Sequence, residues 1–197
     1  IGSCAFDGCN NVISVELPAS LQSIEKSAFI QCSSLERIEI PFAVTDIGDD
    51  AFAYCGNLKK VNLPEALKII GQEAFADCPK LESITIPEHT MEIGERAFYR
   101  CRTLENVQLN ADIVRISDYA FSGCSSLKYA EIPESVTYLG AGVFQECVAM
   151  ENVKIPQSIE NLRFGTFYNC VLLKNVIIPE GVVNIRNYAF YGCKNLE

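Results

Sequence analysis

A phenylalanine recurs every 23 residues along the chain, and a cysteine follows each one three residues later. The phenylalanines stand at positions 6, 29, 52, 75, 98, 121, 144, 167 and 190. A fixed period of this length, without insertions, is typical of solenoids in which each repeat contacts only its neighbours. Residues 1–197 are therefore predicted to form one solenoid of about eight and a half repeats. Because the chain starts and stops within a repeat, we expect it to be a fragment of a longer protein.

Each repeat contains a short segment in which apolar and polar residues alternate, as in Ile38-Glu39-Ile40 and Val61-Asn62-Leu63. This alternation is typical of a half-buried strand. A proline follows the segment in most repeats, with Asn110 as an exception, and proline ends a strand because it cannot donate a ladder hydrogen bond. Stacked repeats place these segments at about 4.8 Å spacing, which predicts a parallel sheet on one face.

A second pair of apolar residues follows the proline, for example Val44 and Ile47, and predicts another short extended segment. The next position is Gly48, Gly71, Gly94 or Gly140 in four repeats, and Ser117, Arg163 or Arg186 in others. A left-handed backbone is therefore not obligatory at this corner. The segment from Phe52 to Cys55 has room only for a turn of 3₁₀- or α-helix, and we expect such a turn there.

The skeleton Leu35-x-x-Ile38-x-Ile40-Pro41-x-x-Val44-x-x-Ile47-Gly48-x-x-Ala51-Phe52-x-x-Cys55 resembles the BspA-type class of leucine-rich repeats. The resemblance covers essentially the whole chain. It implies a β-rich leucine-rich-repeat solenoid of the α/β horseshoe class, with a parallel β-sheet on one face and short extended segments and helical turns on the other. It also implies a secreted or surface-attached protein, mostly from bacteria, that engages host or neighbouring-cell proteins.

Composition narrows the classes of partner. The net charge of −9 and the pI of about 4.7 argue against nucleic-acid binding, which depends on clustered lysine and arginine. No apolar run approaches the roughly 18 to 20 residues that span a bilayer, so we expect no membrane crossing. The segment that begins at Ile1 has no signal-peptide pattern, so an extracellular or cell-surface location follows from the resemblance alone.

Nine of the ten cysteines occur once per repeat and should stack in a single row. A row cannot surround a metal tetrahedrally, so we expect no zinc site. Neighbouring cysteines could reach disulfide distance, but a row of nine cannot pair completely. The sequence therefore predicts small, buried, reduced thiols. Cys4 lies outside the row, is expected to be exposed, and is the candidate for a reactive or intermolecular thiol.

The sequence offers no set of residues with complementary catalytic roles, so we expect a non-enzymatic protein without a cofactor. His89 is the single histidine and follows a predicted strand, at a position that is variable among the repeats. It is expected to be an exposed loop residue and not part of a catalytic triad. No glycine-rich phosphate loop or calcium-binding loop is present.

The polar residues of the predicted strands differ from repeat to repeat while the skeleton stays fixed. Such variation is expected of a recognition surface, and it is equally expected of solvent-exposed positions that drift during evolution. The candidate partner-binding residues on this face are Arg37, Glu39, Lys60, Asn62, Thr85, Gln108, Tyr129, Glu131 and Lys154. Tyrosines near the phenylalanine row either contact partners or shield that row, and these are Tyr54, Tyr99, Tyr119, Tyr168, Tyr188 and Tyr191.

The leading functional hypothesis is a cell-surface module that binds a host or neighbouring-cell protein through the strand face. One alternative is a structural spacer or stalk that carries another domain. Another is a carbohydrate-binding module, which would need several aromatic platforms on one face, whereas the strand face supplies only Tyr129.

Overall fold

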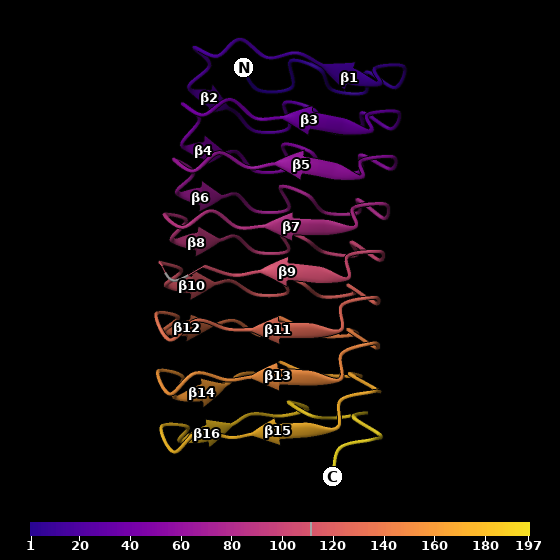
Figure 1. Ribbon diagram of the computed structural model, residues 1–197. Helices are drawn as coiled ribbons and strands as arrows, with labels where there is room; N and C mark the ends of the chain where they lie inside the picture. Colours follow the sequence, from indigo (N-terminus) through magenta and orange to yellow (C-terminus); the bar gives the residue numbers. More distant parts are fainter. Residues whose placement is uncertain (111) are drawn as a thin grey trace.

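The computed structural model describes residues 1–110 and 112–197 as a stack of coils, each one repeat long (Figure 1). Each coil carries a strand on two sides, and the coils follow one another in chain order from the N-terminus to the C-terminus. All strand pairs of the described residues are parallel. The protein is therefore a parallel β-solenoid, as the fixed period predicted, and it is like the leucine-rich-repeat solenoid that the resemblance implied.

The longer strands form the first β face. They pair in the orders β1-β3-β5 and β7-β9-β11-β13-β15, with each residue opposite its equivalent in the next coil, as Arg37 is opposite Lys60. In the strands from β3 to β13 a buried residue lies between two exposed ones, which confirms the predicted alternation. The bounds are β1 Ser14–Val15, β3 Arg37–Glu39, β5 Lys60–Asn62, β7 Ser83–Thr85, β9 Asn106–Gln108, β11 Tyr129–Glu131, β13 Asn152–Lys154 and β15 Asn175–Ile177.

Strands of two residues form the second β face, where the apolar pair after each proline predicted an extended segment. They pair as β2-β4-β6-β8-β10-β12 and as β14-β16. The bounds are β2 Ser23–Ile24, β4 Asp46–Ile47, β6 Ile69–Ile70, β8 Glu92–Ile93, β10 Arg115–Ile116, β12 Tyr138–Leu139, β14 Asn161–Leu162 and β16 Asn184–Ile185.

The helical turns predicted between the phenylalanine and the cysteine of each repeat are wrong. The N–H groups of Ala53 and Cys55 donate three residues back, but those of Phe52 and Tyr54 donate to carbonyls of the next coil. Asp50 and Tyr54 have φ angles of 56° and 61°, and equivalent residues elsewhere repeat this left-handed pair. A helix needs right-handed residues throughout. The segment is therefore a series of turns, because the neighbouring coil takes half of its hydrogen bonds.

The core is a column of stacked phenylalanine rings surrounded by aliphatic rows. Consecutive ring centroids lie 4.8 to 5.8 Å apart, with planes within 13° of parallel. The rings from Phe29 to Phe167 are fully buried. Because the rings of one coil are covered by those of the coils above and below, the core forms only when repeats stack.

The glycines before the turn segment allow successive coils to approach closely. Gly48, Gly71, Gly94 and Gly140 are not among the residues with positive φ, as the sequence predicted. A Cβ atom built on Gly71 would lie 2.7 Å from the backbone of Gly48. The glycine row thus forms a low floor beside the second β face.

Candidate functional site

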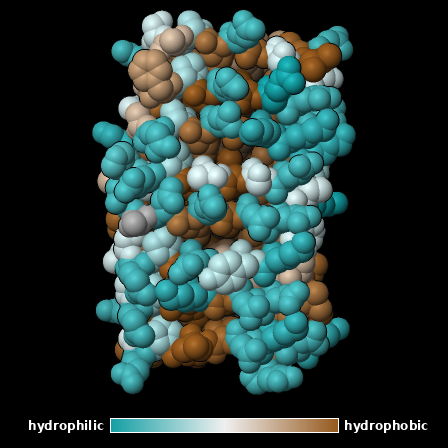
Figure 2. Space-filling model, in the orientation of Figure 1, coloured by the Kyte–Doolittle hydropathy of each residue, from teal (hydrophilic) through white to brown (hydrophobic). Residues whose placement is uncertain are grey.

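All nine residues predicted to bind a partner lie exposed on the first β face, on strands β3 to β13. Figure 1 shows these strands stacked along one side of the molecule, and Figure 2 shows, in the same orientation, mostly hydrophilic side chains with hydrophobic atoms between them. The side chains also contact one another between coils. Thr85 Oγ1 donates to Gln108 Oε1 at 3.2 Å, and Lys154 Nζ lies 3.2 Å from Glu131 Oε1. The structure therefore brings the predicted residues together in one continuous surface.

The first β face is hollowed over β9, β11 and β13 by a cavity of about 870 Å³. Gln108, Tyr129, Glu131 and Lys154 line it, together with Asn110 where other repeats have proline. Glu131 accepts hydrogen bonds from Lys154 and from the hydroxyl of Tyr129 at 3.4 Å. These contacts hold an aromatic ring, a cation and an anion in a fixed arrangement.

The electrostatics of this hollow follow from those contacts. The pKa of Tyr129 is raised by desolvation and by the nearby Glu131 charge. The hydrogen bond to Glu131 raises the pKa of Lys154. Tyr129 is therefore a neutral hydrogen-bonding ring and Lys154 a cation at neutral pH, and the hollow can receive polar groups of either charge.

Three ion pairs border the first β face, formed by the residues directly before β3 and β5, before β9 and β11, and before β13 and β15. Lys59 pairs with Glu36 at 3.3 Å, and Lys174 pairs with Glu151 at 2.7 Å. A third pair, Lys128 with Glu105, has a separation of 2.9 Å. Exposed pairs of this kind contribute little to stability. These pairs were not predicted from the sequence, although a lysine and a glutamate 23 residues apart are their visible signal.

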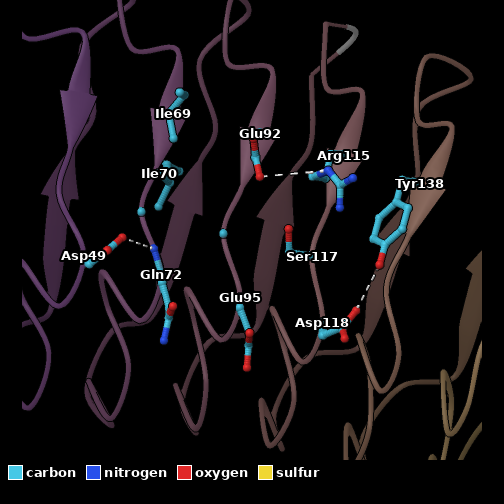
Figure 3. Close-up of a pocket in the computed structure, with 12 residues that line it drawn as sticks. Asp49, Ile69, Ile70, Gln72, Glu92, Glu95, Arg115, Ser117, Asp118 and Tyr138 are labelled. Atoms are coloured by element: carbon cyan, nitrogen blue, oxygen red, sulfur yellow. Dashed lines mark hydrogen bonds and ion pairs between the residues drawn. The ribbon is translucent and has the colours of Figure 1, made fainter.

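The second β face carries a cavity of about 410 Å³ that the sequence analysis did not identify. Its floor includes Gly71 and Gly94, where no side chain fills the space between the walls. Figure 3 shows Arg115 between Glu92 and Tyr138, and the hydroxyl of Tyr138 directed at Asp118. The cavity could have been predicted from the row of glycines, because residues without a side chain leave space between neighbouring side chains.

The cysteine row consists of free thiols, and Cys4 is exposed, as the sequence predicted. Each thiol from Cys32 to Cys193 donates to the carbonyl of the phenylalanine 26 residues before it, at 3.1 to 3.3 Å. Burial raises the pKa of Cys78, Cys101 and Cys147 well above its ordinary value. Because the thiolate is the reactive form, these buried thiols are inert.

His89 is exposed and pairs with Asp112 of the next coil, with 3.1 Å between Nδ1 and Oδ2. The two residues are equivalent in neighbouring repeats, and neither lines the cavities of the two β faces. Among the residues that the structure describes, no group of three or more His, Cys, Asp or Glu is placed to bind a metal. Residues 1–110 and 112–197 also contain no helix long and apolar enough to cross a bilayer.

The tyrosines near the phenylalanine row contact one another and nearby arginines. Tyr168 and Tyr191 stack at 5.2 Å, and Tyr188 meets both edge-on. The Arg96 guanidinium lies 5.5 Å from the Tyr119 ring. Tyr188 and Tyr191 nevertheless remain more than half exposed. These contacts agree with shielding of the core.

The family model of the BspA type leucine rich repeat region matches residues 1–102 and 68–197, in six copies. No curated protein matches the chain in sequence. Among solved structures, a Treponema pallidum leucine-rich repeat protein is 30% identical, with a TM-score of 0.68, over 94% of this chain and 78% of that one.

Two further solved structures cover the whole of this chain. A leucine-rich cell surface protein from Faecalibacterium prausnitzii is 28% identical, with a TM-score of 0.61. A leucine-rich repeat protein from Bacteroides ovatus is 26% identical, with a TM-score of 0.62. The chain spans 61% and 68% of the length of these two proteins.

Proposed function

This chain belongs to the BspA-type leucine-rich repeat family, and we propose that its first β face binds a protein of a host or neighbouring cell. Leucine-rich repeats commonly serve as scaffolds for protein interaction, and a similar structure is that of a cell surface protein. A location outside the cell or at its surface is part of the same proposal.

The observation that carries the proposal is the pre-ordered polar surface of the first β face. Its exposed side chains alternate with buried ones such as Ile38, Ile84 and Val153, which anchor each strand in the core. Backbone ladders between coils fix the spacing of the exposed residues. A partner that binds such a surface pays little conformational entropy for ordering it.

The hollow around Tyr129 is the proposed centre of contact. Tyr129 is 47% exposed, and its hydrogen bond to Glu131 orients the ring. Tyrosine is among the residues that dominate binding free energy at protein interfaces. Arg37 and Lys60 add positive charge on neighbouring strands near the N-terminal end of the face. We expect this charge to affect association rate more than affinity.

A paired set of variants tests the proposal. Tyr129→Ala with Lys154→Glu alters the hollow, whereas Tyr54→Ala with Lys26→Glu removes an equally exposed tyrosine and an exposed lysine elsewhere. Binding of labelled protein to host epithelial cells and to immobilised extracellular-matrix proteins is measured for both. The first variant should bind at least tenfold more weakly, since a central aromatic residue contributes about 2 kcal/mol or more.

Loss in the second variant alone would place the contact on the tyrosine side of the coil and contradict the proposal. Equal loss in both variants would also contradict it, because the binding would then not be specific to the first β face. No binding of the wild-type chain to any cell or matrix protein would favour the spacer alternative. Circular dichroism and the thermal midpoint of each variant establish that the fold is retained.

A further inference from the structure

Two arginines replace the glycine row in the last coils. Arg163 and Arg186 stand 23 and 46 residues after Gly140, at positions equivalent to Gly71 and Gly94. Where the earlier coils leave a low floor, these coils therefore project long cationic side chains beside the second β face. This local concentration of positive charge is unusual in a chain with a net charge of −9.

Both guanidinium groups are free to bind an anion. The ion pairs that arginines make in the described residues belong to Arg96 and Arg115, so Arg163 and Arg186 have no carboxylate partner there. Arg163 instead lies over the ring of Tyr138, 4.4 Å from its centroid, and Arg115 of a preceding coil lies 3.8 Å from the same centroid. Tyr138 thus holds the guanidinium group of Arg163 in place without neutralising its charge.

Asp118 fixes the position of Tyr138. Its Oδ1 atom accepts a hydrogen bond from the Tyr138 hydroxyl at 3.4 Å and another from the backbone N–H of Ala141 at 3.0 Å. Figure 3 shows the Tyr138 side chain turned toward Asp118, with Arg115 on the neighbouring strand. The Oδ1 atom of Asp118, which lines the pocket, is therefore already bonded to donors of the protein.

The arginines open into a pocket of about 590 Å³, which is within the usual range of small-ligand sites. Asn161, Asn187 and Phe164 also line it. Asn161 accepts a hydrogen bond from Asn184 through Oδ1, so its NH₂ group remains available to a ligand. Phe164 is 45% exposed and is held edge-on against Tyr188, with 5.6 Å between the ring centroids.

We propose that this pocket on the second β face binds a sugar that carries a carboxylate, such as a uronic or sialic acid. The planar guanidinium groups of Arg163 and Arg186 match a carboxylate through paired hydrogen bonds. The asparagine amides can bond ring hydroxyls, and the exposed Phe164 ring can pack on the apolar face of a pyranose. A bare phosphate would use only the arginines and leave the amides and the ring without a role.

The test compares charged and neutral sugars of the same size. Methyl glucuronide, N-acetylneuraminic acid and methyl glucoside are titrated into the full chain and followed by NMR chemical-shift changes. At least one acidic sugar should bind about tenfold or more tightly than the glucoside, because the glucoside lacks the charge-assisted hydrogen bonds. Added salt should weaken that binding.

Two variants assign the site. Arg163→Gln with Arg186→Gln should reduce binding of the acidic sugar to the level of the glucoside. Arg37→Gln with Lys60→Gln removes the same charge from the first β face and should leave sugar binding unchanged. Circular dichroism of both variants checks the fold.

Equal affinity for charged and neutral sugars, or no detectable binding of either acid, would overturn the proposal. Equal loss in the two charge variants would also overturn it, because general charge would then explain the binding. A glutamate-rich peptide that binds this pocket more tightly than both acids would show that the assigned ligand class is wrong. Protein binding through the first β face would stand or fall independently of these results.

Discussion

The buried cysteine row makes this fold sensitive to alkaline pH. The thiols of Cys55, Cys78, Cys101, Cys124, Cys147 and Cys170 are buried in the core, and burial raises the pKa of each. In the unfolded chain these thiols regain their ordinary pKa of 9.0. Above pH 9 the unfolded state therefore binds fewer protons than the folded state, and the free energy of unfolding must fall as pH rises.

The size of the effect follows from the number of buried thiols. Each thiol that stays protonated in the fold but ionises on unfolding costs about 1.4 kcal/mol at one pH unit above its unfolded pKa. Six such thiols together lower the free energy of unfolding by about 8 kcal/mol at pH 10. Because a domain is usually stable by only about 5 to 15 kcal/mol, we expect cooperative unfolding near this pH. Below about pH 8 the contribution should be constant.

The measurement is urea denaturation between pH 7 and pH 10.5 with a reductant present, followed by far-ultraviolet circular dichroism because the chain has no tryptophan. Cys101→Ala should lessen the decline by the share of one thiol, about 1.4 kcal/mol at pH 10. Cys4→Ala is the matched control, since Cys4 is exposed. A free energy of unfolding that is constant from pH 8 to pH 10 would refute the reasoning, as would identical slopes for the wild type and Cys101→Ala.

Three further predictions concern packing and accessibility. Phe98→Ala should lower the free energy of unfolding, measured by urea denaturation, by about 3 to 5 kcal/mol, and Phe190→Ala should lower it less. The reason is that Phe98 is fully buried between two rings, whereas Phe190 is half-buried against one. Equal losses of stability would argue against an array in which each repeat contacts only its neighbours. Gly142→Ala should lower the free energy of unfolding by about 1 kcal/mol or more, because the φ of Gly142 is +58° and a Cβ atom would meet the Tyr119 ring. Gly56→Ala is the control and should be near neutral, because a Cβ atom there meets nothing within 4 Å. Similar thermal midpoints for the two variants would contradict the prediction. Thiol counting should find Cys4 as the fast-reacting thiol of the native chain and all ten after unfolding; fewer than ten after unfolding would reveal cross-links.

Much of the first β face could be predicted from the sequence. The alternation around Ile38 and its equivalents placed Arg37 and Glu39 on the solvent side, and the fixed period placed the other candidates in the same rows. The period of the sequence predicts which residues face the solvent because each coil repeats the backbone path of the one before. The sequence could not show that Tyr129, Glu131 and Lys154 enclose a hollow, since that depends on how their side chains contact one another between coils.

The pocket on the second β face could not be predicted from the sequence. Arg163 and Arg186 were recognised only as replacements of a corner glycine, and their role depends on Tyr138, which lies on a different row and a different coil. Residues brought together across rows have no fixed spacing in the sequence. Only the packing of side chains above the glycine floor places these groups around one pocket.

The sequence by itself determined the solenoid, its period, the phenylalanine and cysteine rows and the exposed rows of the first β face, because identical stacked repeats leave one register for their apolar residues. Only the tertiary structure decided the form of the turns. Short segments such as 50–55 could satisfy their hydrogen bonds within a helix or between coils, and the neighbouring coil supplies acceptors at every second residue. The chain therefore adopts left-handed turns where the local sequence alone allowed a helix.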